Sequence, residues 1–246
     1  MRRIVVLGTG TAVGKTYFAE RLIRALAVAR PLEDVVGIKA IETGIRSPAG
    51  RSSPERARDA GAPPRRSDAW RLERVSRGTP IRPHPVQGFS DAVSAHLAAR
   101  RDGRSVNLHR IAECLALHAT TIHGWQIVEM AGGVFSPVSR KATNIDLALA
   151  LEPSIWVVVA PDALGVLHDV RATLLAMHTC ARAPDHLVLS AARSIDASSG
   201  TNAAELSLIG LPRPAAVLHR GDDAQASLAP LVAKILKARP ARSRRR

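Results

Sequence analysis

Short apolar runs recur along the chain, and most are followed by a segment in which apolar residues have helical spacing. The runs that predict buried strands are residues 4–7, 35–39, 126–129, 154–159, 186–189 and 215–218. The segments that predict helices are residues 17–29, 91–101, 108–123, 165–180 and 224–238. Strands that alternate with helices and are apolar on both faces form parallel sheets covered on two sides. The predicted fold is therefore α/β: a doubly wound, mostly parallel sheet with helices on both faces, in a single domain.

Two segments depart from this alternation. Residues 46–66 contain four prolines and no aliphatic residue larger than alanine, so they predict a mobile surface insertion without a core of its own. Residues 239–246 are dominated by arginine and predict a basic, disordered tail. The expected organisation is one domain over residues 1–238, with the insertion inside it and the tail after it.

Composition narrows the class of protein. The chain has 246 residues, of which 46% are hydrophobic, as in an ordinary globular protein. Its longest apolar runs are far shorter than a membrane span, and the run near the start is too short for a secretory signal. We therefore expect a soluble, cytoplasmic protein that has no membrane partner.

The charge is strongly basic, with 35 lysines and arginines against 21 acidic residues and a net charge of +14. Such a balance is compatible with nucleic-acid binding. However, only 3% of the residues are aromatic and could stack on bases, and no helix-turn-helix or zinc pattern accompanies the charge. We expect a solvated, arginine-rich surface with no specific nucleic-acid partner.

A phosphate-binding motif follows the first predicted strand. Residues 8–16, with the sequence GTGTAVGKT, match G-x-x-x-x-G-K-[ST] without a mismatch. Glycines allow backbone N–H groups to turn toward an anion, and the N-terminus of the following helix points at it. Lys15 would reach the β- and γ-phosphates, and the Thr16 hydroxyl would bind Mg²⁺. The fold is then of the P-loop NTPase type, with ATP and Mg²⁺ as the expected cofactors.

Three further polar residues are candidates for the same site. Lys39 ends the second predicted strand, Glu129 ends the third, and Asp68 follows the predicted insertion. Ligands in doubly wound folds bind at the carboxyl ends of the strands. A carboxylate there can hold Mg²⁺, as a Walker-B acid does. The alternatives are a solvated charge for Lys39, a helix cap for Asp68 and a turn residue for Glu129.

At these motifs the sequence resembles the dethiobiotin synthetase family. The resemblance rests on the phosphate loop, on residues 37–44 (GIKAIETG), on residues 67–69 (SDA) and on residues 129–137 (EMAGGVFSP), with weaker support from residues 164–168 (LGVLH). Order and spacing match over roughly residues 3–220. The phosphate loop is shared by many families, whereas the lysine strand and the Glu-x-Ala-Gly-Gly element are more specific.

The resemblance implies an ATP-dependent enzyme that closes the ureido ring of dethiobiotin from 7,8-diaminononanoate and CO₂, acting as a homodimer. Metal ligands carried over onto this chain are Thr16, Asp68 and Glu129. Lys15 and Lys39 would neutralise phosphate and carbamate, and Thr11 and Thr43 would line the diamine site. The nucleotide-binding set is Gly10, Thr11, Ala12, Val13, Gly14, Lys15, Thr16, Tyr17, Glu129, Gly132 and Ser190. The helix start at Gly165 and Val166 would meet the substrate's tail carboxylate from across the dimer.

Some positions depart from the family pattern. Gly10 and Ala12 stand where the family places acids, Ala40 replaces a proline, and Asp91 lies within Ser-Asp-Ala instead of Ser-Pro-His. Ser190 stands where the family has the asparagine that reads the adenine edge, and a hydroxyl cannot present the paired donor and acceptor of an amide. These changes fit relaxed base selectivity or a different substrate.

Two alternative functions remain open. One is an ATPase of the same branch that activates a different carboxylate substrate. The other is a nucleotide switch resembling the MinD/ParA ATPases, although these use an additional lysine where Gly10 stands here.

Overall fold

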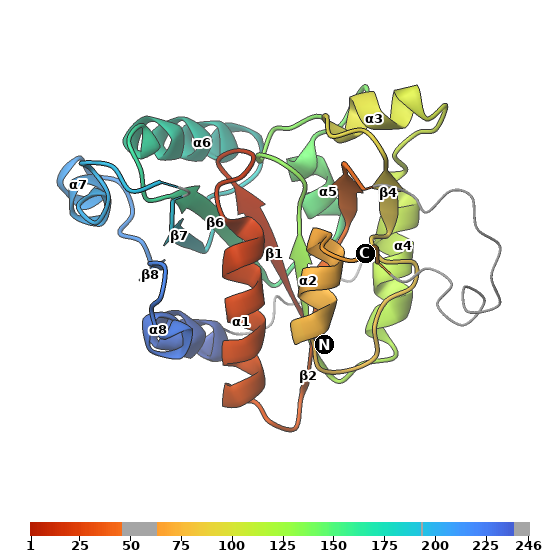
Figure 1. Cartoon of the computed structure of the whole chain (residues 1–246), viewed down its shortest axis with the longest axis horizontal. Helices are drawn as coiled ribbons and strands as arrows, with labels where there is room; N and C mark the ends of the chain where they lie inside the picture. The colour runs from red at the N-terminus through yellow and green to blue at the C-terminus, as the bar shows by residue number, and fades with distance from the viewer. Residues whose placement is uncertain (46–62, 193, 239–246) are drawn as a thin grey trace.

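The computed structural model describes residues 1–45, 63–192 and 194–238. Most of the predicted insertion, residues 46–62, and the predicted tail, residues 239–246, lie outside the described residues. Six parallel strands form one sheet in the order β2-β5-β1-β6-β7-β8 (Figure 1). They are β1 (Arg2–Gly8), β2 (Asp34–Lys39), β5 (Gly124–Glu129), β6 (Ile155–Pro161), β7 (His186–Ser190) and β8 (Ala216–Val217). The predicted α/β fold is confirmed.

Helices cover both faces of this sheet, and each face has its own core. Ile4 and Val6 of β1 belong to a core shared with α1 (Lys15–Ala29), α2 (Asp68–Val75) and α8 (Ala224–Lys237). Val5 and Leu7 point the other way, because side chains alternate along a strand. They pack in a core with α3 (Ala95–Arg101), α4 (Leu108–Ala119), α5 (Asn144–Ala150), α6 (Val166–Cys180) and α7 (Asn202–Leu208). The central strand is therefore buried on both sides.

Two predicted helices are shorter than their sequence patterns. The helix expected over residues 91–101 begins at Ala95, because the Ser94 side chain accepts a hydrogen bond from Leu97 N–H and Asp91 is held in a turn by Gly44 N–H. The helix expected over residues 108–123 ends at Ala119. There the hydroxyls of Thr120 and Thr121 donate back to carbonyls of the last turn, which stops the helix before β5 begins.

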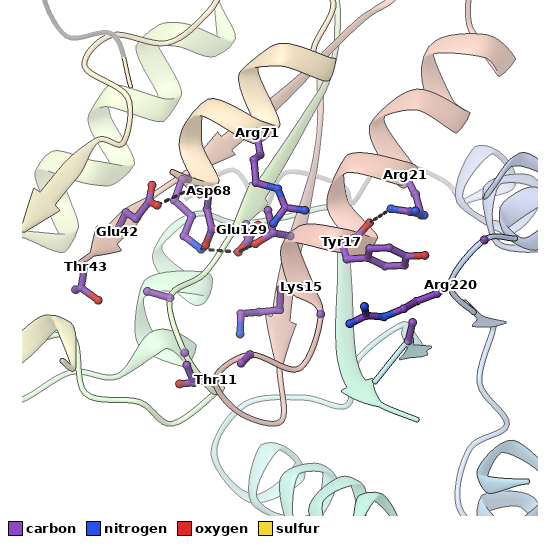
Figure 2. Close-up of a pocket in the computed structure, with 18 residues that line it drawn as sticks. Thr11, Lys15, Tyr17, Arg21, Glu42, Thr43, Asp68, Arg71, Glu129 and Arg220 are labelled. Atoms are coloured by element: carbon purple, nitrogen blue, oxygen red, sulfur yellow. Dashed lines mark hydrogen bonds and ion pairs between the residues drawn. The ribbon is translucent and has the colours of Figure 1, made fainter. Parts of the chain in front are cut away.

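A small second sheet lies beside the main one. β3 (Ile41–Thr43) follows β2 almost directly and pairs in parallel with β4 (Gln87–Phe89). This pairing fixes the chain beyond Lys39, so that Glu42 and Thr43 lie next to the carboxyl ends of the main strands (Figures 1 and 2). No described helix is long and apolar enough to cross a membrane.

Candidate active site

The phosphate loop lies between the end of β1 and the start of α1, at the carboxyl edge of the sheet. Gly14 precedes α1 with a left-handed φ of 91°, and no side chain caps the helix. The first backbone N–H groups of α1 therefore remain available for an anion. Lys15 bends back over the loop, where its Nζ donates to the carbonyl of Gly10 at 2.8 Å.

Four of the predicted side chains meet beside the loop, although they come from four elements. The Thr16 hydroxyl on α1 donates to Glu129 Oε1 on β5 at 2.8 Å. Lys39 Nζ, at the end of β2, donates to Asp68 Oδ2 on α2 at 2.8 Å and also to Glu129 Oε1. The side chain of Lys39 is 5% exposed and that of Glu129 is 1% exposed. The structure thus brings together residues that are up to 113 positions apart in the sequence.

Burial and charge act against each other in this cluster. Burial alone would lower the pKa of Lys39, but Glu129 and Asp68 outweigh it and raise that pKa above its ordinary value. Burial would raise the pKa of Asp68, yet the Lys39 ammonium holds it below its usual range. For Lys15, burial dominates and lowers the pKa to about 8. The cluster thus consists of two carboxylates, Asp68 and Glu129, joined by the Lys39 ammonium, beside the less basic Lys15.

The donor set fits a magnesium ion. Asp68, Glu129 and Thr16 supply two carboxylates and a hydroxyl, which are the hard oxygen ligands that Mg²⁺ prefers. Glu129 Oε2 is buried and has no hydrogen-bond partner among the described residues. A buried carboxylate oxygen without a donor is costly unless a cation or water meets it. This oxygen is therefore the strongest structural sign of a cation site.

A pocket of about 620 Å³ opens over the loop and the carboxylates. In Figure 2 Lys15 lies near its centre, Glu42 and Thr43 lie on one side, and Tyr17, Arg21 and Arg220 lie on the other. Most of the predicted residues line it: Thr11, Ala12, Gly14, Lys15, Thr16, Tyr17, Lys39, Thr43, Asp68, Glu129 and Gly132. The labelled lining residues thus fall into two groups on opposite sides of Lys15, and each group is called an arm of the pocket below.

Three of the predicted nucleotide-binding residues, Gly10, Val13 and Ser190, are not among the residues that line this pocket. Val13 is buried in the core behind the loop. Ser190 is fully buried, and its hydroxyl faces the carbonyl of Gly14 at 3.4 Å. A serine at this position therefore supports the loop from beneath, and it is the neighbouring Ala191 that reaches the pocket.

Sequence reasoning missed four lining residues with charged side chains. Glu42 lies within the motif of residues 37–44, which assigns it no role; burial raises its pKa, and its carboxylate accepts hydrogen bonds from the backbone of α2. Arg71 reaches the pocket from α2 and pairs with Glu20 at 2.6 Å. Arg21 stacks on Tyr17, with its guanidinium carbon 3.3 Å from the ring centroid, and Arg220 follows β8. Spacing one turn after the loop could have indicated Arg21, but no pattern pointed to the others.

Comparison with known proteins places the chain among P-loop proteins. A family model described as an AAA domain matches residues 2–194. Among solved structures, MinD of Pyrococcus horikoshii in complex with Mg-ADP has a TM-score of 0.52 at 10% identity, covering 96% of each chain. MinD of Pyrococcus furiosus has a TM-score of 0.51 at 14% identity, covering 96% of this chain and 99% of that one. At such identities the likeness extends to the fold alone.

Curated relatives are closer in sequence. The ATP-dependent dethiobiotin synthetase BioD of Anaeromyxobacter dehalogenans strain 2CP-1 is 33% identical over 219 residues, which are 89% of this chain and 90% of that protein. The protein of the same name from Rhodopirellula baltica is 31% identical, covering 86% of this chain and 82% of its own length. With identity sustained over nearly the full length of these relatives, and with the lysine and carboxylate motifs meeting at one phosphate loop, the chain belongs to the dethiobiotin synthetase family of P-loop proteins.

Proposed function

We propose that the protein is an ATP-dependent dethiobiotin synthetase that converts 7,8-diaminononanoate, CO₂ and ATP into dethiobiotin, ADP and phosphate. The observation that carries the proposal is the cluster of Lys39, Asp68 and Glu129 beside Lys15 and Thr16. A phosphate loop, a second lysine and two carboxylates around one pocket suit the transfer of phosphate to a carboxylate-like group, because both reactants carry negative charge that must be neutralised.

The proposed reaction has three steps. One substrate amine attacks CO₂, loses a proton and gives a carbamate. A carbamate oxygen then attacks the γ-phosphorus of ATP, and ADP leaves. Finally the second amine attacks the carbonyl carbon and loses a proton, the bond from that carbon to the phosphoryl oxygen breaks, and phosphate leaves as the ring closes. Catalysis of this kind depends on positioning and charge neutralisation more than on acid–base groups.

The residues of the pocket take distinct roles in this proposal. Lys15 and the backbone N–H groups of the loop bind the triphosphate, and Lys39 neutralises the carbamate and the transferring phosphoryl group. Mg²⁺, held by Thr16, Asp68 and Glu129, would supply positive charge to the phosphate oxygens. Thr11 and Thr43 would line the diamine arm. Tyr17, Arg21 and Arg220 lie on the opposite arm, which suits the nucleoside part of ATP.

A homodimer belongs to the same proposal. Gly165 has a left-handed φ of 94°, and α6 begins after it without a side-chain cap, so its first N–H groups can receive a carboxylate. The neighbouring Leu164 is 84% exposed, which is compatible with an interface. Light scattering coupled to gel filtration would test this point, since a mass of one chain, 26.2 kDa, at micromolar concentration would contradict it.

The activity is tested with purified protein, 7,8-diaminononanoate, bicarbonate, MgCl₂ and ATP. The expected result is dethiobiotin, identified by mass spectrometry, in equal amount to the ADP formed. Lys15→Met should abolish both products. If neither ring product nor diamine-stimulated phosphate release is found, the proposal is wrong. ATP turnover that another carboxylate stimulates, while the diamine does not, would favour the related enzyme with a different substrate.

A further inference from the structure

Glu42 connects the small sheet to the first turn of α2. It lies on β3, and its carboxylate is buried, with the residue 6% exposed. Oε1 accepts a hydrogen bond from Asp68 N–H at 2.6 Å, and Oε2 accepts one from Ala69 N–H at 3.0 Å. Figure 2 shows this contact directly beside the carboxylate pair. Both N–H groups belong to the helix start, where no intrahelical carbonyl can satisfy them.

The contact matters because Asp68 is the first residue of α2. Its side chain reaches Lys39 and belongs to the set of oxygen ligands described above. The usual cap of this helix, Ser67, accepts from Trp70 N–H and so ties the first turn only to itself. Among the described residues, Glu42 supplies the side-chain bonds that join the N–H groups of Asp68 and Ala69 to another element. The place of Asp68 relative to Glu129 and Thr16 therefore depends on Glu42.

We propose that Glu42 is a positioning residue for the metal: by holding the start of α2 against β3, it fixes Asp68 in the geometry that a divalent ion bound with nucleotide requires. This inference rests on the proposed magnesium–nucleotide site. Glu42 also lines the pocket next to Thr43, so the same carboxylate links the metal ligand to the arm assigned to the diamine.

Glu42→Gln is the informative change. The amide keeps the shape of the side chain, but its NH₂ group cannot accept from a backbone N–H, so one of the two bonds is lost together with the negative charge. Groups that orient a metal ligand typically contribute about 10–100-fold to metal affinity. We expect Glu42→Gln to bind Mn²⁺ about tenfold more weakly than the wild type in the presence of nucleotide.

Ser67→Ala is the matched control. It removes one hydrogen bond from the same turn of the same helix, but it leaves the bonds from Glu42 to Asp68 and Ala69 in place. If Glu42 only stabilised the fold, the two variants would lower the melting temperature and change Mn²⁺ binding in parallel. If Glu42 positions Asp68, Ser67→Ala lowers the melting temperature about as much as Glu42→Gln does, but it keeps Mn²⁺ affinity within twofold of the wild type.

The experiment is a titration of Mn²⁺ followed by electron paramagnetic resonance, with a non-hydrolysable ATP analogue and no diamine present. The proteins are the wild type, Glu42→Gln, Glu42→Asp, Ser67→Ala and, as the reference for a lost ligand, Asp68→Asn. Glu42→Asp retains the charge and should recover part of the affinity that Glu42→Gln loses. The inference is overturned if Glu42→Gln binds Mn²⁺ within twofold of the wild type, or if Ser67→Ala weakens binding equally. Because no diamine is used, a missing synthetase activity would leave this result unaffected.

Discussion

Lys39 is the residue on which the charge balance of the site depends. Its ammonium lies between the carboxylates of Asp68 and Glu129 and is almost fully buried. Charges taken out of water in this way are tolerated only when they are paired, and removing one partner is far more costly than the pair itself. The free protein therefore keeps two acidic groups close together by placing its own cation between them.

Lys39→Met should make this dependence visible. The variant leaves two neighbouring carboxylates without their cation, so we expect the free energy of unfolding to fall by about 3 kcal/mol. Millimolar Mg²⁺ should restore part of that loss, because a divalent ion can replace the ammonium between the same oxygens. Urea unfolding with and without Mg²⁺ measures both effects, and Lys141→Met on the exposed surface is the control. A stability equal to that of the wild type would contradict the argument.

Gly14 is constrained by both its backbone and its neighbour. A Cβ at this position would lie 2.2 Å from Ser190 Oγ, and its φ of 91° is left-handed. We expect Gly14→Ala to cost about 1–2 kcal/mol for the backbone and about 1–3 kcal/mol more for the clash. Adding Ser190→Gly to this variant should recover the stability lost through the clash, but not the stability lost through the backbone. Thermal unfolding of the single and double variants tests this separation, which fails if the second change brings no recovery.

At the scale of elements, α2 is held at both of its ends. Glu42 contacts its start, and Glu73 near its end accepts hydrogen bonds from Arg82 and His84. His84 in turn accepts from Lys39 N–H through Nε2, so the Nδ1 that faces Glu73 carries the proton of the neutral ring. Burial lowers the pKa of His84, which favours that neutral form. The helix carrying Asp68 is thus connected to β2 through side chains as well as by packing.

The bonds of Glu73 should make stability depend on acidity. Burial alone would raise the pKa of Glu73, but hydrogen bonds from His84 and Arg82 lower it from 4.5 to about 2. A carboxylate whose pKa is lower in the folded than in the unfolded protein stabilises the fold fully at pH values above its unfolded-state pKa. This contribution is lost as the pH falls toward the folded-state pKa. Since the side chain is 26% exposed, solvent screening reduces the expected contribution to about 1 kcal/mol. Glu73→Gln should therefore be less stable than the wild type at pH 7.

The measurement is urea unfolding of both proteins between pH 7 and pH 2. The difference between them should remain constant down to about pH 4.5 and should then shrink as the pH approaches 2, where Glu73 becomes protonated in both states. A difference that persists unchanged at pH 2 would mean that Glu73 acts through packing and not through its charge.

The sequence predicts elements well where apolar residues run long enough to show a period. All strands of the main sheet were predicted within a few residues, because they are apolar on both faces. In contrast, α5 and α7 have seven residues each and β3 and β4 have three, and neither an apolar run nor helical spacing longer than the element itself marks them in the sequence. The predicted insertion, residues 46–66, separates β3 from α2 in the sequence. Without β3, nothing in the sequence predicts that Glu42 lies near Asp68.

The candidate site was accessible to sequence reasoning for a related reason. Lys15 and Thr16 follow from a local motif, and Lys39 and Glu129 follow from the rule that parallel strands end at one edge. Neither the motif nor this rule predicts the role of Glu42. Its partners are backbone N–H groups, which almost every residue type has, so the sequence does not reveal them. Arg220 lines the pocket from beyond β8, at the edge of the sheet opposite to β2. Its position depends on where β8 ends, which the sequence does not define.

At the scale of the whole molecule, the excess of positive charge should cause weak association with polyanions. The net charge is +14, and binding that neutralises several phosphates falls steeply with salt because counterions are released. We expect duplex DNA to bind at 50 mM salt and to lose about 10³-fold or more in affinity by 200 mM, without sequence preference. Fluorescence anisotropy with two unrelated duplexes measures both. Affinity that survives 200 mM salt, or that differs between the duplexes, would instead indicate a specific nucleic-acid site.

The central strand of the sheet, β1, pairs only with strands that are synthesised much later than itself. Val5 of β1 pairs with Val128 of β5 on one side and with Trp156 of β6 on the other. The phosphate loop leaves the ribosome well before β5 and β6, so its supporting strand has no partner until more than a hundred further residues have followed. At about 5–20 residues per second, that interval lasts on the order of ten seconds or more. β1 exposes two unpaired edges until β5 is made and one until β6 is made, so a chain that terminates before β6 should aggregate and should not retain nucleotide.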